Sequence, residues 1–341
     1  MNKLAAVAVL CATSLPMATQ TKVLVPKSRL PSVTFDGFRN FALPTACDEE
    51  GRSYVKLVKP GPGWDGPLLR FSPKGALEAE FDTGGALVNI YAVRPSGGVA
   101  MVHLDGATKV VDNFGPDGKR ESSVRLEIPP IGFFPSQIAV FRSGQILVSG
   151  LQYRPGYIAS SAVYDPTGHL VKQFALDGDA EIERAVKVGD ARYTRSPQGF
   201  NEAVSRSVAI TGEDGLVYLM RATSPATVYV ISPAGDVIRK IVVSAPTDTG
   251  LPAFGIRVVK NKLAVKFDRS CVGTLDLNDC EGAAYTVVDA TTGKKLADYE
   301  AAQGTDGPIA CYAPNPDRFF TFGFVTSSDQ HRLEIVEAGP K

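Results

Sequence analysis

Seven polar and aromatic side chains offer the chemistry from which a binding site could be built. Hydrogen-bond donors beside flat aromatic faces suit a polar ligand, one that is anionic or carbohydrate-like. The expected set is Asn89, Gln137, Arg206, Arg257, Trp64, Tyr153 and Tyr193. These residues are widely spaced along the chain, so only a fold that returns repeatedly to one point can gather them.

Signatures of catalysis are scarce. The chain has only three histidines, His103, His169 and His331, and it contains no HExxH pair, phosphate loop or Gly-Ser-Gly nucleophile elbow. The segment Asp276–Asp279 carries oxygens that Ca²⁺ accepts, but it lacks the twelve-residue layout of an EF-hand, and a solvated loop explains it as well. We therefore predict no metal site and no cofactor. Whether the protein is an enzyme stays open, although the sequence favours a protein without catalytic activity.

Charge and composition exclude some classes of partner. The 36 basic residues equal the 36 acidic residues in number. Because no surplus of positive charge attracts phosphates, no nucleic-acid partner is expected. Apolar residues make up 44% of the chain, enough for a large core, and its 33 glycines and 24 prolines are spread along it. That spread favours many short elements separated by turns.

The first twenty residues have the layout of a secretory signal peptide. A short cationic start precedes the apolar run Leu4–Leu15, and small residues suited to cleavage follow. The run is too short to span a membrane, and no other segment reaches eighteen apolar residues. We expect export to the periplasm or the extracellular space, and no integral membrane segment in the mature chain. Two alternatives are a lipoprotein anchored at Cys11, although Leu10 suits that cleavage poorly, and a buried N-terminal strand.

Export permits disulfides, and four cysteines remain after residues 1–20. Cys271 and Cys280 are separated by a loop that contains Gly and Asp, and we predict that they are bonded. Cys47 and Cys311 hold equivalent places in two copies of a repeat, where either a disulfide or two buried thiols would fit. No spacing resembles CxxC, so zinc and redox sites are not favoured.

Internal repetition is the strongest signal in the sequence. A turn that ends in Gly recurs five times, as FSPKG (71–75), FGPDG (114–118), YDPTG (164–168), ISPAG (231–235) and VDATTG (288–293). Runs typical of β-strands flank each turn. A second kind of turn, which usually holds Gly, separates two further strands and occurs six times. The spacing fits a unit of four strands and roughly 40 to 50 residues, with insertions.

Six such units predict a β-propeller, because a four-stranded unit cannot bury both of its faces alone. The last unit lacks its outermost strand, whereas residues 22–36 precede the first unit as an extended segment. We therefore expect this N-terminal strand to close the last blade. The expected fold is all-β, a six-bladed β-propeller of four-stranded antiparallel blades, forming a single domain over residues 21–341.

The repeated order of strands and turns over residues 40–341 resembles that of the NHL-repeat and TolB-like six-bladed propellers. The resemblance implies a fold and not an activity. Exported lactonases of this architecture bind a divalent cation with a Glu, Asn and Asp set. In place of their Glu-Gly-Pro segment this chain has Pro60–Trp64. A metal-dependent hydrolase of the lactonase type, or a lyase, is therefore the alternative function.

Strand direction in such a propeller puts the variable loops on the face where the innermost strands begin. These loops are 58–67, 151–158, 177–204 and 268–282. Variation on one rim favours binding there, although neutral drift in surface loops and a Trp64 that merely fills the side of a blade are alternatives. Arg257 replaces the Ala of the repeat, so it either points into the central channel or pairs with a carboxylate there.

The expected function is an exported binding or interaction module. Its partner would be a small molecule, a glycan or a protein that meets the seven candidate residues at the mouth of the funnel. A purely structural component of the cell envelope is a third class that the sequence permits.

Overall fold

The computed structural model describes residues 21–30, 33–35, 40–58, 66–81, 90–105, 108–127, 133–154, 156–180, 203–246, 252–268, 283–302, 304–305, 307–326 and 331–341. Within these ranges the regular structure is almost entirely β-strand, with helical turns at 177–180 and 203–205. The prediction of an all-β chain is confirmed.

Four sheets each contain four antiparallel strands that follow one another along the chain. The first two sheets consist of β3 (Asn40–Cys47), β4 (Ser53–Val58), β5 (Leu68–Phe71) and β6 (Leu77–Phe81), then β7 (Tyr91–Val93), β8 (Val99–Asp105), β9 (Thr108–Phe114) and β10 (Arg120–Arg125). The next two consist of β11 (Phe133–Val140), β12 (Ile146–Arg154), β13 (Gly156–Tyr164) and β14 (Leu170–Phe174), then β15 (Val208–Thr211), β16 (Val217–Arg221), β17 (Ala226–Ile231) and β18 (Val237–Val243). These strands cover those expected from the repeat.

The remaining strands of the described chain form one nine-stranded sheet. Its members are β19 (Ala253–Val259), β20 (Lys262–Asp268), β21 (Ala283–Asp289), β22 (Lys295–Ala301), β23 (Ile309–Ala313), β24 (Arg318–Thr326), β25 (His331–Pro340), β1 (Lys22–Arg29) and β2 (Val33–Phe35). The expectation of six separate four-stranded sheets therefore needs correction, because the described strands form four such sheets and this larger one.

The N-terminal strand β1 is the reason for the larger sheet. It pairs antiparallel with β25, from Leu24 opposite Pro340 to Arg29 opposite Val336, as expected for a segment that completes the last repeat. Its other edge pairs parallel with β22, which the sequence did not predict. Because β1 has a partner on each side, it joins the strands of the last two repeats into one sheet.

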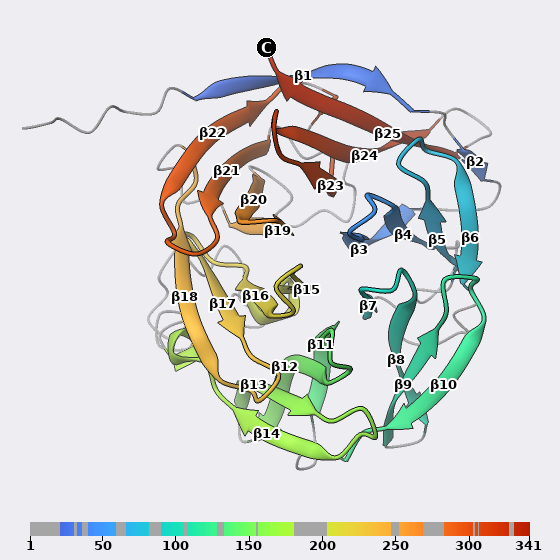
Figure 1. The fold of residues 1–341 in the computed structure, drawn as a ribbon, viewed down its shortest axis with the longest axis vertical. Coiled ribbons are helices and arrows are strands. Elements are labelled where there is room, and N and C mark those ends of the chain that lie inside the picture. The colour runs from blue at the N-terminus through green and yellow to red at the C-terminus, as the bar shows by residue number, and fades with distance from the viewer. Residues whose placement is uncertain are drawn as a thin grey trace, which may run out of the picture.

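The sheets are arranged around a central axis in the manner of a propeller (Figure 1). The first strand of each repeat lies innermost, and β3, β7, β11, β15, β19 and β23 contact one another in turn around a closed ring. Apolar side chains fill the space between neighbouring sheets; Met220, Val265 and Phe267, for example, belong to one cluster. The ring thus brings the beginnings of the innermost strands to one place.

Glycine geometry confirms the repeated turns. Gly75, Gly118 and Gly168 adopt φ values of 82°, 79° and 94°, a left-handed conformation that favours glycine. At Gly168 a Cβ atom would come within 2.1 Å of the Arg125 carbonyl oxygen. At Gly118 and Gly168 glycine is therefore required both by the backbone angle and by a carbonyl of the neighbouring sheet, whereas at Gly75 the backbone angle alone favours it.

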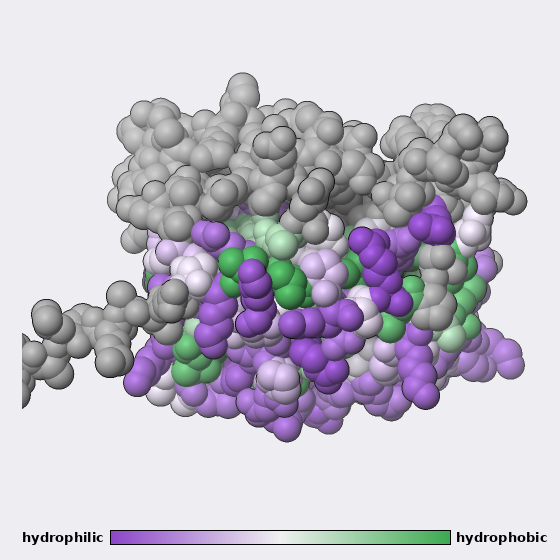
Figure 2. Space-filling model, turned by 90° about the horizontal axis from the view of Figure 1, so that it is seen from above, coloured by the Kyte–Doolittle hydropathy of each residue, from purple (hydrophilic) through white to green (hydrophobic). Residues whose placement is uncertain are grey.

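The described surface is predominantly hydrophilic in the edge-on view, with a few hydrophobic patches (Figure 2). Within the described ranges, no helix has the length and apolar character needed to cross a membrane.

Candidate functional site

An arc of polar and aromatic side chains lies where three neighbouring innermost strands begin. Gln137 of β11, which is only 5% exposed, donates from Nε2 to the Ser205 carbonyl oxygen at 3.4 Å. The next residue, Arg206, precedes β15 and is half-buried, with its guanidinium carbon 5.8 Å from the centroid of the Phe254 ring. We call the group Gln137, Arg206, Phe254 and Lys266 the mouth cluster.

Lys266 brings a second cation to the same ring. Its Nζ lies 5.8 Å from the Phe254 centroid and 2.5 Å from Asp268 Oδ1. Both side chains of this ion pair are 2% exposed. A cation held over an aromatic face by a buried carboxylate keeps a fixed position. Phe254, which is half-buried, is thus flanked by one buried and one accessible cation.

The structure places two of the seven candidate residues, Gln137 and Arg206, in this cluster. A third, Tyr153, lies in β12 opposite Tyr157 of β13. Asn89, Trp64 and Tyr193 lie outside the described residues, as do the predicted partners Cys271 and Cys280. For those residues the sequence-based expectations stay predictions.

Arg257 lies deeper than expected, between the two faces of the ring that the innermost strands form. Its side chain is buried, and it donates to backbone oxygens of β23 and β3 and to its own neighbour Ile256. No carboxylate among the described residues lies within ion-pairing distance of it. The ion pair that the sequence allowed is thus not found among the described residues, and backbone oxygens bind the guanidinium in its place.

Burial sets the charge state of this arginine. Desolvation lowers the pKa of the Arg257 guanidinium to about 10, and the hydroxyls of Tyr91 and Tyr285 oppose that shift. The group is still protonated at neutral pH, so the axis carries a buried positive charge.

A cavity of about 250 Å³ opens on the opposite face, where the turns after β3, β7, β15, β19 and β23 converge. Arg257 contributes to its lining, together with Glu50, Arg94 and Glu213. The charges around it engage one another: Arg94 pairs with Glu121 at 2.7 Å, and Arg142 of the third sheet pairs with Glu49 of the first.

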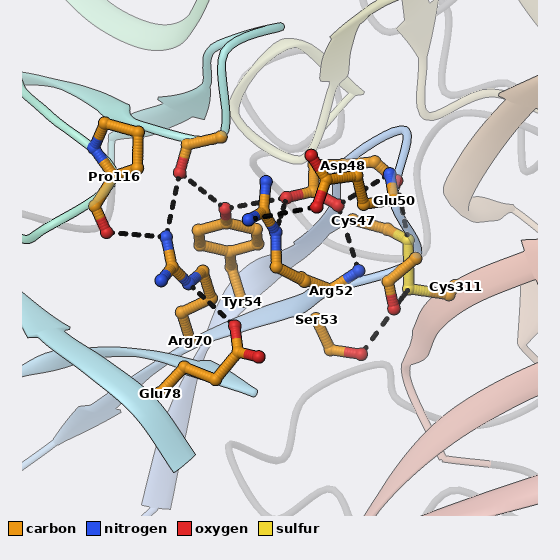
Figure 3. Close-up of polar contacts among 12 residues, drawn as sticks. Cys47, Asp48, Glu50, Arg52, Ser53, Tyr54, Arg70, Glu78, Pro116 and Cys311 are labelled. Atoms are coloured by element: carbon orange, nitrogen blue, oxygen red, sulfur yellow. Dashed lines mark hydrogen bonds and ion pairs between the residues drawn. A yellow bond between two sulfur atoms is a disulfide. The ribbon is translucent and has the colours of Figure 1, made fainter. Parts of the chain in front are cut away.

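The rim of this cavity is held by a network around Asp48 (Figure 3). Its carboxylate accepts from the backbone N–H groups of Glu50 and Arg52 and from Arg52 Nε at 2.6 Å. The hydroxyl of Tyr54 donates to the Gly97 carbonyl oxygen at 2.7 Å, with Asp48 Oδ2 3.0 Å away. Burial and the nearby Asp48 charge raise the pKa of Tyr54. These contacts fix the turn and leave the carboxylate fully engaged, so they indicate structure rather than binding.

Cys47 and Cys311 form a disulfide beside the same rim, with their Cα atoms 5.2 Å apart (Figure 3). Of the two alternatives that the sequence left open, the bonded one is confirmed. The bond connects the first repeat with the last one at the end of β3 and in the middle of β23.

Metal ligands do not gather in the part of the chain that the structure describes. No group of three or more His, Cys, Asp or Glu side chains is placed there so as to hold a metal ion. His103 instead pairs with Asp112, Nδ1 to Oδ2 at 3.1 Å, and His169 with Glu127.

A fully buried ion pair was missed by the sequence reasoning. Arg221 at the end of β16 is 0% exposed and binds Asp179 through two parallel contacts, Nε to Oδ1 at 2.9 Å and Nη2 to Oδ2 at 3.1 Å. Its remaining nitrogen donates to the hydroxyls of Ser149 and Ser207. The partners are 42 positions apart, and no local pattern marks them. Phe254 and Lys266 were missed for the same reason.

Comparisons with known proteins bear on the fold of this chain and not on its function. No family model matches the sequence, and no curated protein matches it. Solved structures do: a protein of unknown function from Dyadobacter fermentans is 10% identical, with a TM-score of 0.50 over 93% of this chain and 99% of that chain.

Two further structures are more distant in shape. A gluconolactonase from Xanthomonas campestris is 12% identical, with a TM-score of 0.49 over 93% of this chain and 98% of that chain. The Dos1 propeller is 11% identical, with a TM-score of 0.40 over 84% of this chain and 75% of that chain. At such identities a likeness concerns the fold alone, so function has to be argued from the site.

Proposed function

We propose that this protein is an exported β-propeller that binds a polar ligand, anionic or carbohydrate-like, at the mouth cluster. The observation that carries the proposal is the placement of Arg206 and Lys266 at equal distances from the Phe254 ring. Two cations over an aromatic ring place positive charge beside an apolar surface, so they can attract the negative or polar groups of a ligand that packs against this cluster.

The mouth cluster is preferred to the cavity on the turn face because it combines an aromatic ring with a cation that solvent reaches. Arg94 and Arg142 beside that cavity are each in an ion pair with a carboxylate. At the mouth, Lys266 and Asp268 are paired and buried, and Arg206 is partly exposed over the Phe254 ring. The remaining candidates, Asn89, Trp64, Tyr153 and Tyr193, would extend this site along the same rim.

Architecture and location form part of the proposal. We take the nine-stranded sheet as two blades joined through β1, which gives six blades in a single domain over residues 21–341. Residues 1–20 would be the signal peptide. The Cys47–Cys311 disulfide supports an oxidising compartment, because such bonds persist there and are rare in the cytosol.

The hydrolase alternative has no observation in its favour among the described residues. The hydrolase alternative would be supported if a glycan, an organic acid or a peptide bound to the protein and was then chemically changed.

Calorimetric titration of a panel of oligosaccharides, sugar acids and acidic peptides against the full mature chain tests the proposal. The Arg206→Ala variant should lose about 1 to 3 kcal/mol of binding free energy if the arginine meets a charged group of the ligand. Phe254→Ala should weaken the same ligand by a similar factor. Arg94→Ala, on the turn face, is the matched control and should bind as the wild type does. A ligand whose affinity ignores Arg206→Ala and Phe254→Ala, or falls with Arg94→Ala, would move the site elsewhere.

A further inference from the structure

The guanidinium of Arg257 is surrounded by oxygens of the backbone. Nε donates to the Ala310 carbonyl at 2.7 Å and Nη1 to the Ile256 carbonyl at 2.6 Å. Nη2 donates to the carbonyl and hydroxyl of Thr45, at 2.9 and 3.2 Å, and to the carbonyl of Ile309. Four carbonyls and one hydroxyl from three innermost strands therefore converge on one planar cation.

Two of these carbonyls, those of Thr45 and Ala310, lie where the strand pairing is irregular. The register of β3 against β4 shifts between Ala42 and Ala46, a stretch that contains Thr45. The register of β23 against β24 shifts between Ile309 and Cys311, a stretch that contains Ala310. A bulge turns backbone groups away from the ladder. Buried carbonyls without a ladder partner need another donor, and the arginine supplies it to Thr45 and Ala310. The Ile309 carbonyl accepts from the Thr45 hydroxyl as well, at 2.6 Å.

Backbone groups also stabilise the positive charge of Arg257. Within the described residues no carboxylate reaches the guanidinium, which is 4% exposed. A buried cation in that position is stabilised by carbonyl dipoles instead of by an anion. A ring of carbonyl oxygens is also how proteins replace the hydration shell of a small free cation.

We propose that the irregular segments of β3 and β23 form a site for a small planar cation on the propeller axis, and that the side chain of Arg257 is its resident occupant. The site is separate from the mouth cluster and does not depend on the ligand proposed there.

Replacing Arg257 by Ala should therefore leave a site that free guanidinium can enter. We expect the Arg257→Ala variant of the full mature chain to melt below the wild type and to regain about 2 °C or more in about 50 mM guanidinium chloride, relative to equal sodium chloride. Methylguanidinium should act at lower concentration, because its methyl group occupies part of the volume left by the deleted side chain. Urea has the same planar shape without the charge, and it should not raise the melting temperature.

Three controls keep the test decisive. The wild type and Arg142→Ala, which keep Arg257 in place, should gain nothing from guanidinium. If Arg257→Ala does not fold alone, its refolding yield should rise with guanidinium and not with sodium chloride. Arg257→Met keeps most of the volume and removes the charge. A Met variant as stable as the wild type, an equal effect of urea, or the absence of any guanidinium-specific gain in the Ala variant would each overturn the proposal.

Discussion

Cys47 and Cys311 are bonded to each other although 264 positions separate them in the chain. They connect β3 to β23, the two innermost strands at which the ring of repeats closes. Arg257 contacts the same two strands through Thr45 and Ala310. Closure between the first and last repeats is therefore reinforced by a covalent bond and by a buried cation, in addition to the pairing of β1.

Removing this disulfide should lower stability without changing the fold. The double variant Cys47→Ser with Cys311→Ser avoids leaving one reactive thiol, and we expect it to lose about 2 to 4 kcal/mol, because the bond restricts the unfolded chain. Urea denaturation of both proteins, with and without a thiol reductant, measures the loss. Reductant should destabilise the wild type and have less effect on the variant. Equal midpoints for the two oxidised proteins would contradict the prediction.

The predicted bond between Cys271 and Cys280 can be checked in the same preparation. Peptide mapping without reduction should find the two cysteines in one linked pair of peptides, or within one peptide that is lighter by two hydrogens than its reduced form. Free thiols at both positions in freshly exported protein would show that the sequence argument from loop length failed.

Leu24 anchors β1 in the structure, and its neighbour provides a control. Leu24 is 0% exposed within an apolar cluster that includes Tyr285 and Phe319, whereas Val23 on the same strand is 43% exposed. Leu24→Ala should cost about 2 to 5 kcal/mol of unfolding free energy, because it removes apolar contacts and leaves a cavity. Val23→Ala should change stability by about 0.5 kcal/mol or less.

Deleting residues 21–38 should have a larger effect than Leu24→Ala and cause aggregation, since the deletion exposes the edges of β22 and β25. Similar melting temperatures for all of these proteins would mean that β1 is not part of the stable fold.

The buried pair of Arg221 and Asp179 should be sensitive to loss of one partner. Asp179→Ala leaves the guanidinium in a site with no exposure, and we expect a loss of about 3 to 5 kcal/mol. Arg125 and Asp105 form a comparable contact in which the side chains are 69% and 53% exposed. Breaking that surface pair with Asp105→Ala should cost about 1 kcal/mol or less. Chemical denaturation of the two variants compares them directly, and equal losses would contradict the importance of burial.

The pair of His169 and Glu127 gives a pH-dependent contribution. The hydrogen bond and the charge of Glu127 raise the pKa of His169 above its ordinary value of 6.5, and the same contact, with the Leu170 N–H, lowers the pKa of Glu127. A raised histidine pKa stabilises the folded state fully below the unfolded value near 6.5, and that gain disappears as pH rises through the folded pKa. The difference in stability between wild type and Glu127→Gln should therefore shrink as pH increases through that window. An NMR titration of the His169 ring should show its pKa falling in Glu127→Gln. An unchanged ring pKa would contradict the prediction.

The architecture was largely predictable because short sequence patterns, the turn glycines and the apolar runs, determine each sheet. Each turn glycine fixes a left-handed backbone angle, and each apolar run fills an inner strand, so the repeat specifies its own sheets. The pairing of β1 with β25 followed from counting which strand was missing. Its parallel pairing with β22 did not follow, because the outer edge of a neighbouring repeat carries no sequence mark for an incoming strand.

The candidate site was predictable only in part. Gln137 and Arg206 could be named because the repeat marks the innermost strands to which they belong or lead, Gln137 within β11 and Arg206 just before β15. Phe254 and Lys266 reach the same place from two strands of one repeat, and their contact depends on side-chain packing that spacing does not encode. The sequence marked Arg257 as an exception to the repeat, but two of its acceptors, Thr45 and Ala310, lie at register shifts of β3 and β23 that no sequence pattern predicts.

The position of β1 also has a kinetic consequence for synthesis. This strand leaves the ribosome early, but both of its partners, β22 and β25, belong to about the last fifty residues to be made. Until they arrive, β1 has two unpaired edges and the ring is open, so the nascent chain presents strand edges that could pair with other chains. If the chain crosses a membrane N-terminus first, as the proposed export implies, this strand stays unpaired for nearly the whole passage, and a chaperone that covers its edges would lower the risk of aggregation.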